Sequence, residues 1–296
     1  MKNIVDLHTH TTKSDGTYTP NELLMEAESK GLKILSITDH ECVDAYFDID
    51  TKLFSGKIIP GIELRTSCFG VAIELLAYGF DIKKMKETIE KFHYKNTKEL
   101  DEYMIHLAYI QYNERGIKLD NDFIETYNSE IYPRFSKYLY ASVKKHIENQ
   151  ELLKELPEGK SFFRYCMTNP KSPFFLDLSS AFPTIKELVN AIKNASGFIS
   201  IPHIFEYKDN AEKILKHLIE NYNIDAIECF YPSFTKEQTE YLLEICKKYN
   251  KFSSGGSDFH GAVRPKTELG RGENNNLFVP IEKVEEWINK ISKFKN

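Results

Sequence analysis

The sequence predicts an α/β fold in which parallel strands form a barrel and the functional side chains gather at one rim. Short apolar runs alternate with helical patterns in both the early and the late parts of the chain, and parallel strands need such crossover connections. This alternation is compatible with a barrel or with an open sheet. A second observation favours the barrel: histidines and carboxylates follow several of the apolar runs, and barrel enzymes gather their catalytic groups at the carboxyl ends of different strands.

The first predicted strand leads into the motif DLHTHTTKSDG at residues 6–16. Side chains in an extended strand repeat every two residues, so His8 and His10 point to the same side. An isolated His-x-His pattern is more often an ordinary surface feature. Two imidazoles that converge are nevertheless a good clamp for a divalent metal, because histidine is the commonest metal ligand at neutral pH. Asp15 follows in the same segment.

A helix is predicted next, over residues 19–30. Thr19 and Glu22 have the spacing of a capping box, and Pro20 occupies the first helical position. Gly31 is expected to end the helix.

The remaining predicted strands each bring polar residues with them. KILSIT is followed by Asp39 and His40, and KIIPGIEL reaches Glu63. The same rhythm returns late in the chain, where successive strands carry His203, Glu228, Asp258 and His260. Helical patterns separate these late strands at about 184–196, 209–222 and 235–250.

Between the two halves the strand rhythm is lost and long amphipathic patterns predict helices. We therefore expect a barrel that is divided by an inserted all-helical subdomain, with barrel parts at 1–81 and 179–296 and the insertion at 82–178. Aromatic side chains of the insertion, such as Phe135 and Phe162, are expected to pack between helices, and stacking on a nucleobase is the alternative.

Composition and charge restrict the classes of function. The chain has 41% apolar and 28% charged residues and a net charge of -5, which is ordinary for a globular protein and argues against binding to long nucleic acids. The net charge is compatible with a small anionic substrate. Five cysteines without a Cys-x-x-Cys pair suit free thiols, and there is no apolar run of membrane-spanning length or secretory signal. A cytoplasmic protein with no membrane partner is expected.

The nine histidines fall into two groups. Five lie at predicted strand ends, namely His8, His10, His40, His203 and His260. The other four lie in helical patterns without ligand spacing and are interpreted as surface or packing residues: His93, His106, His146 and His217. Unrelated loop residues are the alternative for the first group, but five such positions at one predicted rim favour a shared site.

These motifs resemble a known family in their order and spacing. DLHTHTTKSDG, SITDHECV, PGIEL, a late IPH and GSDFHG are similar to the motifs of the PHP (polymerase and histidinol phosphatase) phosphoesterases. The resemblance covers roughly residues 3–81 and 184–279, with the helical insertion where many stand-alone members carry one. It implies a distorted seven-stranded β/α barrel with two or three divalent metal ions at its rim.

The resemblance also implies the ligands. A first metal would be bound by His8, His10, Glu63 and Asp258. Glu63 would bridge to a second ion that His203 also binds, and a third would be held by Asp15, His40 and His260. A mixed set of nitrogen and oxygen ligands favours Mn, Fe or Zn over Mg.

The resemblance and the local sequence also suggest catalytic and supporting roles. Asp15, Glu63 and His260 are the implied catalytic residues, and Asp39 is expected to orient an imidazole. The family often has a histidine opening a segment like HLLGYG, whereas this chain reads ELLAYG and places Glu74 there. Glu74 is expected to be a ligand, which would weaken the second site or shift its preference toward Mn or Fe. The alternative is a solvated Glu74 beside a site for two metals.

The expected reaction is hydrolysis of a phosphate ester by a metal-activated hydroxide, without a covalent intermediate. Arg134, in IYPRFSKYL, resembles an RPHFA-like stretch that approaches the substrate phosphate in related proteins, and Arg264 follows the last motif. Both are candidates for substrate binding, although Arg264 and the nearby Arg271 also suit a plain surface loop. The resemblance favours a nucleotide or short oligonucleotide as substrate. Histidinol phosphate is the alternative substrate, and a non-catalytic metal-binding module is the alternative class.

Overall fold

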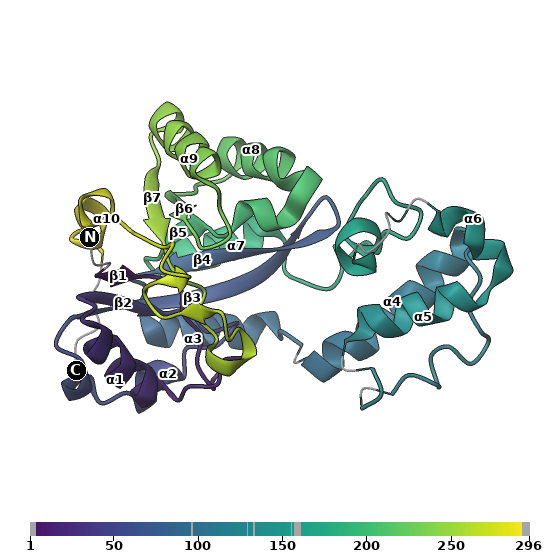
Figure 1. Cartoon of the computed structure of the whole chain (residues 1–296), viewed down its shortest axis with the longest axis horizontal. Helices are drawn as coiled ribbons and strands as arrows, with labels where there is room; N and C mark the ends of the chain where they lie inside the picture. The colour runs from purple at the N-terminus through teal and green to yellow at the C-terminus, as the bar shows by residue number, and fades with distance from the viewer. Residues whose placement is uncertain are drawn as a thin grey trace.

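The computed structural model describes residues 4–291 apart from 96, 129, 133, 155 and 157–160. Its main sheet has seven strands in the spatial order β1 to β7 (Figure 1). The strands are β1 (Val5–Asp6), β2 (Ile34–Ile37), β3 (Lys57–Cys68), β4 (Val71–Tyr78), β5 (Phe198–Ile201), β6 (Ala226–Phe230) and β7 (Phe252–Gly255).

The two edges of this sheet approach each other, so the barrel is nearly closed. The backbone N–H of Leu7 donates to the carbonyl of Gly255 at 3.2 Å, and that of Asp258 donates to the carbonyl of His8 at 2.8 Å. These bonds join the segment after β1 to the end of β7 and to the segment that follows it. The predicted α/β barrel is confirmed, with a helical region between β4 and β5.

One part of the prediction is wrong: not all strands are parallel. β4 pairs antiparallel with both β3 and β5. The reason is local, because β3 and β4 are joined by Phe69 and Gly70, which have φ angles of 54° and 79°. Two positive φ angles make the tight turn of a β-hairpin and leave no room for a crossover helix. β3 also continues to Cys68, so Glu63 lies inside this strand and not at its end.

The predicted helices around the barrel are confirmed. α1 (Pro20–Lys30) begins with a capping box at Thr19 and ends at Gly31, whose φ of 73° is left-handed. α7 (Ile185–Asn194) and α9 (Lys236–Tyr249) also begin with capping boxes. α8 (Ala211–Asn221) lies between them in the chain.

Two more helices pack against the barrel. α2 (Ala45–Asp48) follows β2, and α10 (Ile281–Ile288) lies near the C-terminus. Trp287 of α10 stacks on Phe198 of β5 with ring centroids 4.4 Å apart. Since Trp287 is fully buried together with Tyr78, α10 covers an apolar part of the sheet and stabilises it.

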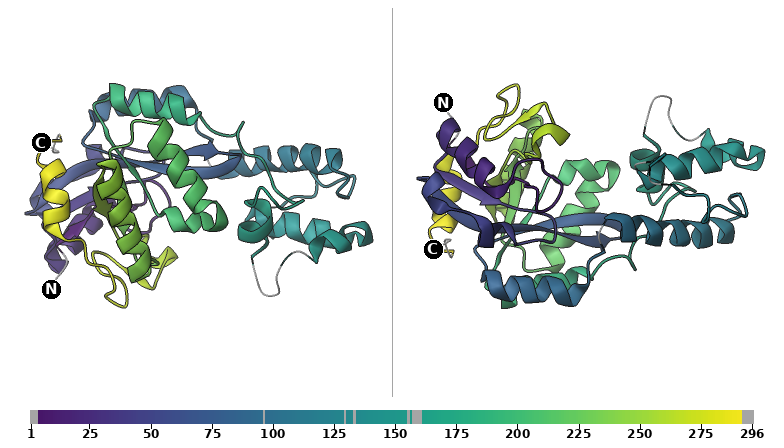
Figure 2. Two further views of the ribbon diagram at one scale, coloured as in Figure 1. Left: turned by 90° about the horizontal axis from the view of Figure 1, so that it is seen from above. Right: turned by 90° about the horizontal axis from the view of Figure 1, so that it is seen from below.

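The helical region has a core of its own. The α-helices between β4 and α7 are α3 (Ile82–Phe92), α4 (Thr97–Glu114), α5 (Phe135–Lys145) and α6 (Gln150–Leu153). Figures 1 and 2 show α4, α5 and α6 in a lobe beside the barrel, whereas α3 lies along the barrel. Phe135 and Phe162 are buried in the core of the lobe, which is the packing role expected of them. Met85 of α3 belongs to the barrel core, and the division of the chain at residues 82 and 178 stays a prediction.

No helix in the described part of the chain combines the length and the apolar character that a membrane span requires.

Candidate metal centre

Glu63 lies at the centre of a cluster of histidines. Its Oε2 is 3.3 Å from Nε2 of both His8 and His10, and its Oε1 is 2.8 Å from Nε2 of His203. Nδ1 of His40 is a further neighbour at 3.5 Å. His8 and His10 therefore face the same point, as their alternation in sequence predicts. Burial by itself raises the pKa of the Glu63 carboxyl, but the surrounding imidazoles outweigh it and hold this pKa well below its usual range.

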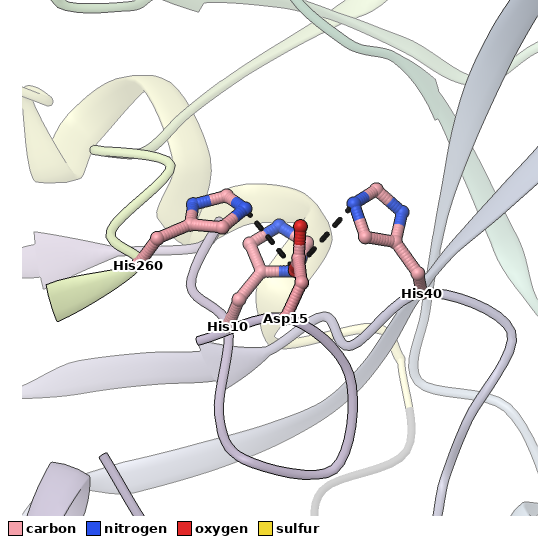
Figure 3. Close-up of side chains that lie close together, drawn as sticks. All are labelled: His10, Asp15, His40 and His260. Atoms are coloured by element: carbon pink, nitrogen blue, oxygen red, sulfur yellow. Dashed lines mark ion pairs between the residues drawn. The ribbon is translucent and has the colours of Figure 1, made fainter. Parts of the chain in front are cut away.

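The structure brings the candidate ligands into three overlapping groups, each with ligand atoms within 4.8 Å of one another. The first consists of His8, His10, Glu63 and Asp258; the second of His10, Asp15, His40 and His260; the third of His40, Glu63 and Glu74. Figure 3 shows the second group, in which the rings of His40 and His260 lie on either side of the Asp15 carboxylate.

Unpaired ring nitrogens indicate that these residues fit divalent metal ions. Nε2 of His10, Nε2 of His260 and Nδ1 of His40 are buried and have no hydrogen-bond partner among the described residues. Buried polar atoms in proteins are almost always paired. Each of these nitrogens has a carboxylate oxygen within 3.5 Å, and imidazole with carboxylate is a donor set suited to Mn, Fe or Zn.

The protonation of the metal-free cluster agrees with this interpretation. Burial lowers the pKa of His10, but the nearby carboxylates of Asp258 and Glu63 outweigh it and raise this pKa to about 10. Burial also lowers the pKa of His203, but the Glu63 carboxylate outweighs it and raises this pKa to about 9. Protons therefore balance the carboxylates when no cation is bound, and a metal ion would replace them.

Glu228 supports the cluster through contacts with His8 and His203. The motifs in the sequence do not predict a role for this residue. Its Oε1 lies 2.9 Å from Nδ1 of His8, and its Oε2 accepts the backbone N–H of His203 at 2.7 Å. The side chain is fully buried in β6. A carboxylate bound to the second nitrogen of a metal-binding histidine fixes the tautomer and orientation of the ring. The signal in the sequence is a glutamate between the apolar residues of AIECF.

We expect Glu228→Gln to lower metal affinity about 10- to 100-fold. His8 and the backbone of His203 contact different oxygens of the carboxylate, and the amide replaces one of these oxygens with an NH2 group that cannot accept a hydrogen bond. Competition with a chromophoric chelator measures the affinity. Glu240→Gln is the matched control, because Glu240 is an exposed residue of α9 that pairs with Lys236. An affinity equal to that of the control would refute the orienting role.

Asp39 has contacts that differ from the expected one. Its carboxylate accepts the backbone N–H and the hydroxyl of Thr11, both at 2.7 Å, and the hydroxyl of Ser14 at 2.6 Å. Ser14 in turn lies 3.5 Å from Nδ1 of His10. Asp39 thus fixes the loop that carries Asp15, and among the described contacts it reaches an imidazole only through Ser14.

Glu74 faces the cluster. It lies on β4, with its carboxylate oxygens 3.5 Å from Nε2 of His203 and 3.8 Å from Nδ1 of His40. Burial, followed by the nearby charge of Glu63, raises the pKa of the Glu74 carboxyl. A cation bound between Glu63 and Glu74 would relieve this repulsion. The solvated alternative fits less well, because only 25% of the side chain is exposed.

The candidate arginines are separated by the fold. Nη1 of Arg264 pairs with Oδ2 of Asp258, and Tyr231 donates its hydroxyl to the same oxygen at 2.8 Å. The other oxygen, Oδ1, is left facing His10 at 3.3 Å. Arg134 is exposed and immediately precedes α5 in the helical lobe. Arg271 lies at the surface near Glu268.

Two cavities adjoin the cluster, and Glu74 lines both. The larger has a volume of about 540 Å³ and is lined by Asp15, His40, Glu41, Arg65, Glu74 and Lys95, among others. The smaller, of about 370 Å³, includes His203, Tyr231, Asp258 and Arg264. Both fall in or near the usual size range of small-molecule sites. Arg134 lines neither cavity, and Arg65 is an arginine that the sequence did not single out.

The nearly closed barrel and the histidine–carboxylate groups at its rim are those of a hydrolase that works with clustered metal ions. The model of the PHP domain matches residues 6–231. The chain therefore belongs to the PHP family and is a metal-dependent phosphoesterase, as the motifs predicted.

Relatives of known activity cover most of the chain. It is 27% identical over 268 residues to a 5'-3' exoribonuclease of Haemophilus influenzae, covering 86% of this chain and 89% of the relative. It is 21% identical over 282 residues to a 3',5'-nucleoside bisphosphate phosphatase of Chromobacterium violaceum, covering 91% and 92%. A solved structure from Bifidobacterium adolescentis superposes with a TM-score of 0.61 at 19% identity, covering 98% of this chain and 97% of the other, and supports the fold.

Proposed function

We propose that the chain hydrolyses phosphate esters of nucleotides or short oligonucleotides with two or three Mn, Fe or Zn ions. The observation that carries the proposal is the position of the three ligand groups beside a cavity of about 540 Å³. Relatives that act as an exoribonuclease and as a nucleoside bisphosphate phosphatase support the choice of substrate. The net charge of -5 argues against long nucleic acids as partners.

The residues of the cluster have distinct proposed tasks. Bound ions would supply an acidified water and neutralise charge on the attacking and leaving oxygens. Glu63 and Asp258 hold the first group together from β3 and from the segment after β7. Asp15 lines the larger cavity, with 54% of its side chain exposed, and is proposed to act together with the buried His260, whose Nε2 lies 3.3 Å from Oδ1 of Asp15. Arg264 orients Asp258 and lines the smaller cavity.

The proposed location is the cytoplasm. The five cysteines lie in the described part of the chain and form no disulfide there, and reduced thiols are typical of a reducing compartment.

Metal analysis of the purified protein combined with a substrate screen tests the proposed function. The panel comprises mononucleotides, nucleoside 3',5'-bisphosphates, short RNA and histidinol phosphate, and both phosphate and nucleotide release are measured. We expect bound Mn, Fe or Zn and turnover of the bisphosphates or the short RNA. Turnover of histidinol phosphate alone would replace the proposed substrate, and bound metal without turnover of any compound would favour a binding module.

A further inference from the structure

We propose that the Glu41–Arg65 pair is the binding site for a second phosphate of the substrate, in addition to the phosphate that reacts at the metal centre. This inference rests on the proposed function and assigns the preference between substrates with one phosphate and with two. It replaces Arg134 with a residue that lines the larger cavity.

The position of Arg65 follows from the β3–β4 hairpin. Arg65 comes two residues after Glu63 on β3, so both side chains emerge on the same face of the strand. It lies directly opposite Glu74 of β4 in the register, and side chains at opposed positions of an antiparallel pair are close neighbours. Glu74 in turn lies 3.8 Å from Nδ1 of His40. Arg65 is therefore adjacent to the metal centre without belonging to its ligand groups.

Glu41 holds the guanidinium in a fixed orientation. Its Oε1 accepts the backbone N–H of Arg65 at 3.0 Å and Nε at 2.7 Å, and its Oε2 accepts Nη2 at 2.8 Å. Such a two-pronged pair orients the planar group firmly. Only 7% of the Glu41 side chain is exposed. The backbone of Glu41 has a φ of 45°, a conformation uncommon for residues other than glycine, and such positions are concentrated at functional sites.

One edge of the guanidinium stays available for a ligand. Nη2 also donates to the carbonyl of Lys95 at 3.4 Å, but no hydrogen bond among the described residues uses Nη1. Nη1 carries two N–H groups, which suit the oxygens of a phosphate. His93 and Lys95 line the same cavity and add donors.

Two further residues, Tyr94 and Phe182, also hold Arg65 in place. The hydroxyl of Tyr94 donates to the backbone carbonyl of Arg65 at 2.8 Å, and the ring of Phe182 lies 5.6 Å below the guanidinium carbon. Arg65 is therefore fixed at its backbone, at its carboxylate partner and at one face. A side chain ordered in this way binds an anion with little additional loss of entropy.

The test compares Arg65→Met with the unchanged protein on two substrates, a nucleoside 3',5'-bisphosphate and the nucleoside monophosphate that carries the same reacting phosphate. We expect kcat/KM for the bisphosphate to fall about 10- to 100-fold further than kcat/KM for the monophosphate, which corresponds to one or two charge-assisted hydrogen bonds. Arg65→Lys should restore only part of the preference, because an ammonium lacks the fork of donors. Glu41→Gln should lower the preference in the same direction.

Arg271→Met is the matched control, because Arg271 is a half-exposed arginine that lines neither cavity. Thermal unfolding of each variant checks the fold. Equal losses of kcat/KM on both substrates in Arg65→Met and Arg65→Lys would overturn the inference and leave Arg65 a structural partner of Glu41. If the protein without any substitution hydrolyses no nucleotide, this result refutes the proposed function itself and not only the role of Arg65.

Discussion

A variant with both His8 and His10 replaced by alanine is expected to lose its bound metal and to hydrolyse phosphate esters at least about a thousandfold more slowly, because metal ions contribute several kcal/mol to phosphoryl transfer. Both rings are fully buried and face Glu63 and Asp258. Their removal leaves these carboxylates without their nitrogen partners and dismantles the first ligand group. Elemental analysis and steady-state kinetics measure the two losses.

His106→Ala is the control for this experiment. His106 is an exposed residue of α4 that contacts the backbone carbonyl of Glu102, and its replacement should change neither metal content nor rate. If the double alanine variant is unfolded by circular dichroism, His8→Gln with His10→Gln keeps the volume of the site and takes its place. Full turnover in a folded variant that holds no metal would defeat the metal-centre interpretation.

The second large effect is expected from removal of the metal with a chelator. Ligands that bind only the folded state stabilise it by about 2.7 kcal/mol at a hundredfold excess over Kd. For a chain of 296 residues that corresponds to roughly 4 °C in Tm, because the entropy of unfolding is about 2.1 cal/mol/K per residue. We therefore expect the chelated protein to unfold at a lower temperature and to be inactive, and added Mn to reverse both effects.

The His8→Gln, His10→Gln variant provides the control for the chelator. Its Tm should respond much less to the chelator than that of the unchanged protein, because its first ligand group is already incomplete. Differential scanning fluorimetry with and without chelator measures the difference. A Tm and an activity that both survive complete removal of metal would contradict the expected dependence.

The roles of Arg134 and Arg65 in substrate binding are both proposals, and they draw on the sequence to different extents. Arg134 was chosen because its neighbours resemble a family motif, yet its position before α5 is in the helical lobe. The apolar pattern KIIPGIEL predicts a strand that ends near Glu63, and this expectation leaves Arg65 outside the strand. The strand continues to Cys68, and the period of two then places Arg65 beside Glu63. A correct strand length would have been enough to find it.

The sequence by itself determined the features that depend on neighbours along the chain. The His8 and His10 rings share a side because a strand alternates, and α1, α7 and α9 begin where threonine caps and Glu or Gln three residues later specify them. The motifs were also sufficient to identify the family, because their spacing reflects the order of strands and crossovers in the barrel.

Only the tertiary structure decided how distant residues meet. Glu228 contacts His8 across 220 positions of sequence, and Glu63 meets His203 across 140. Glu74 enters the cluster because β4 reverses direction at Phe69 and Gly70 and pairs residue by residue with β3. The order of distant strands fixes the contacts of Glu228 and His203, and local periodicity does not encode it because it depends on the packing of the whole barrel. The direction and register of β4 follow instead from the local β3–β4 turn.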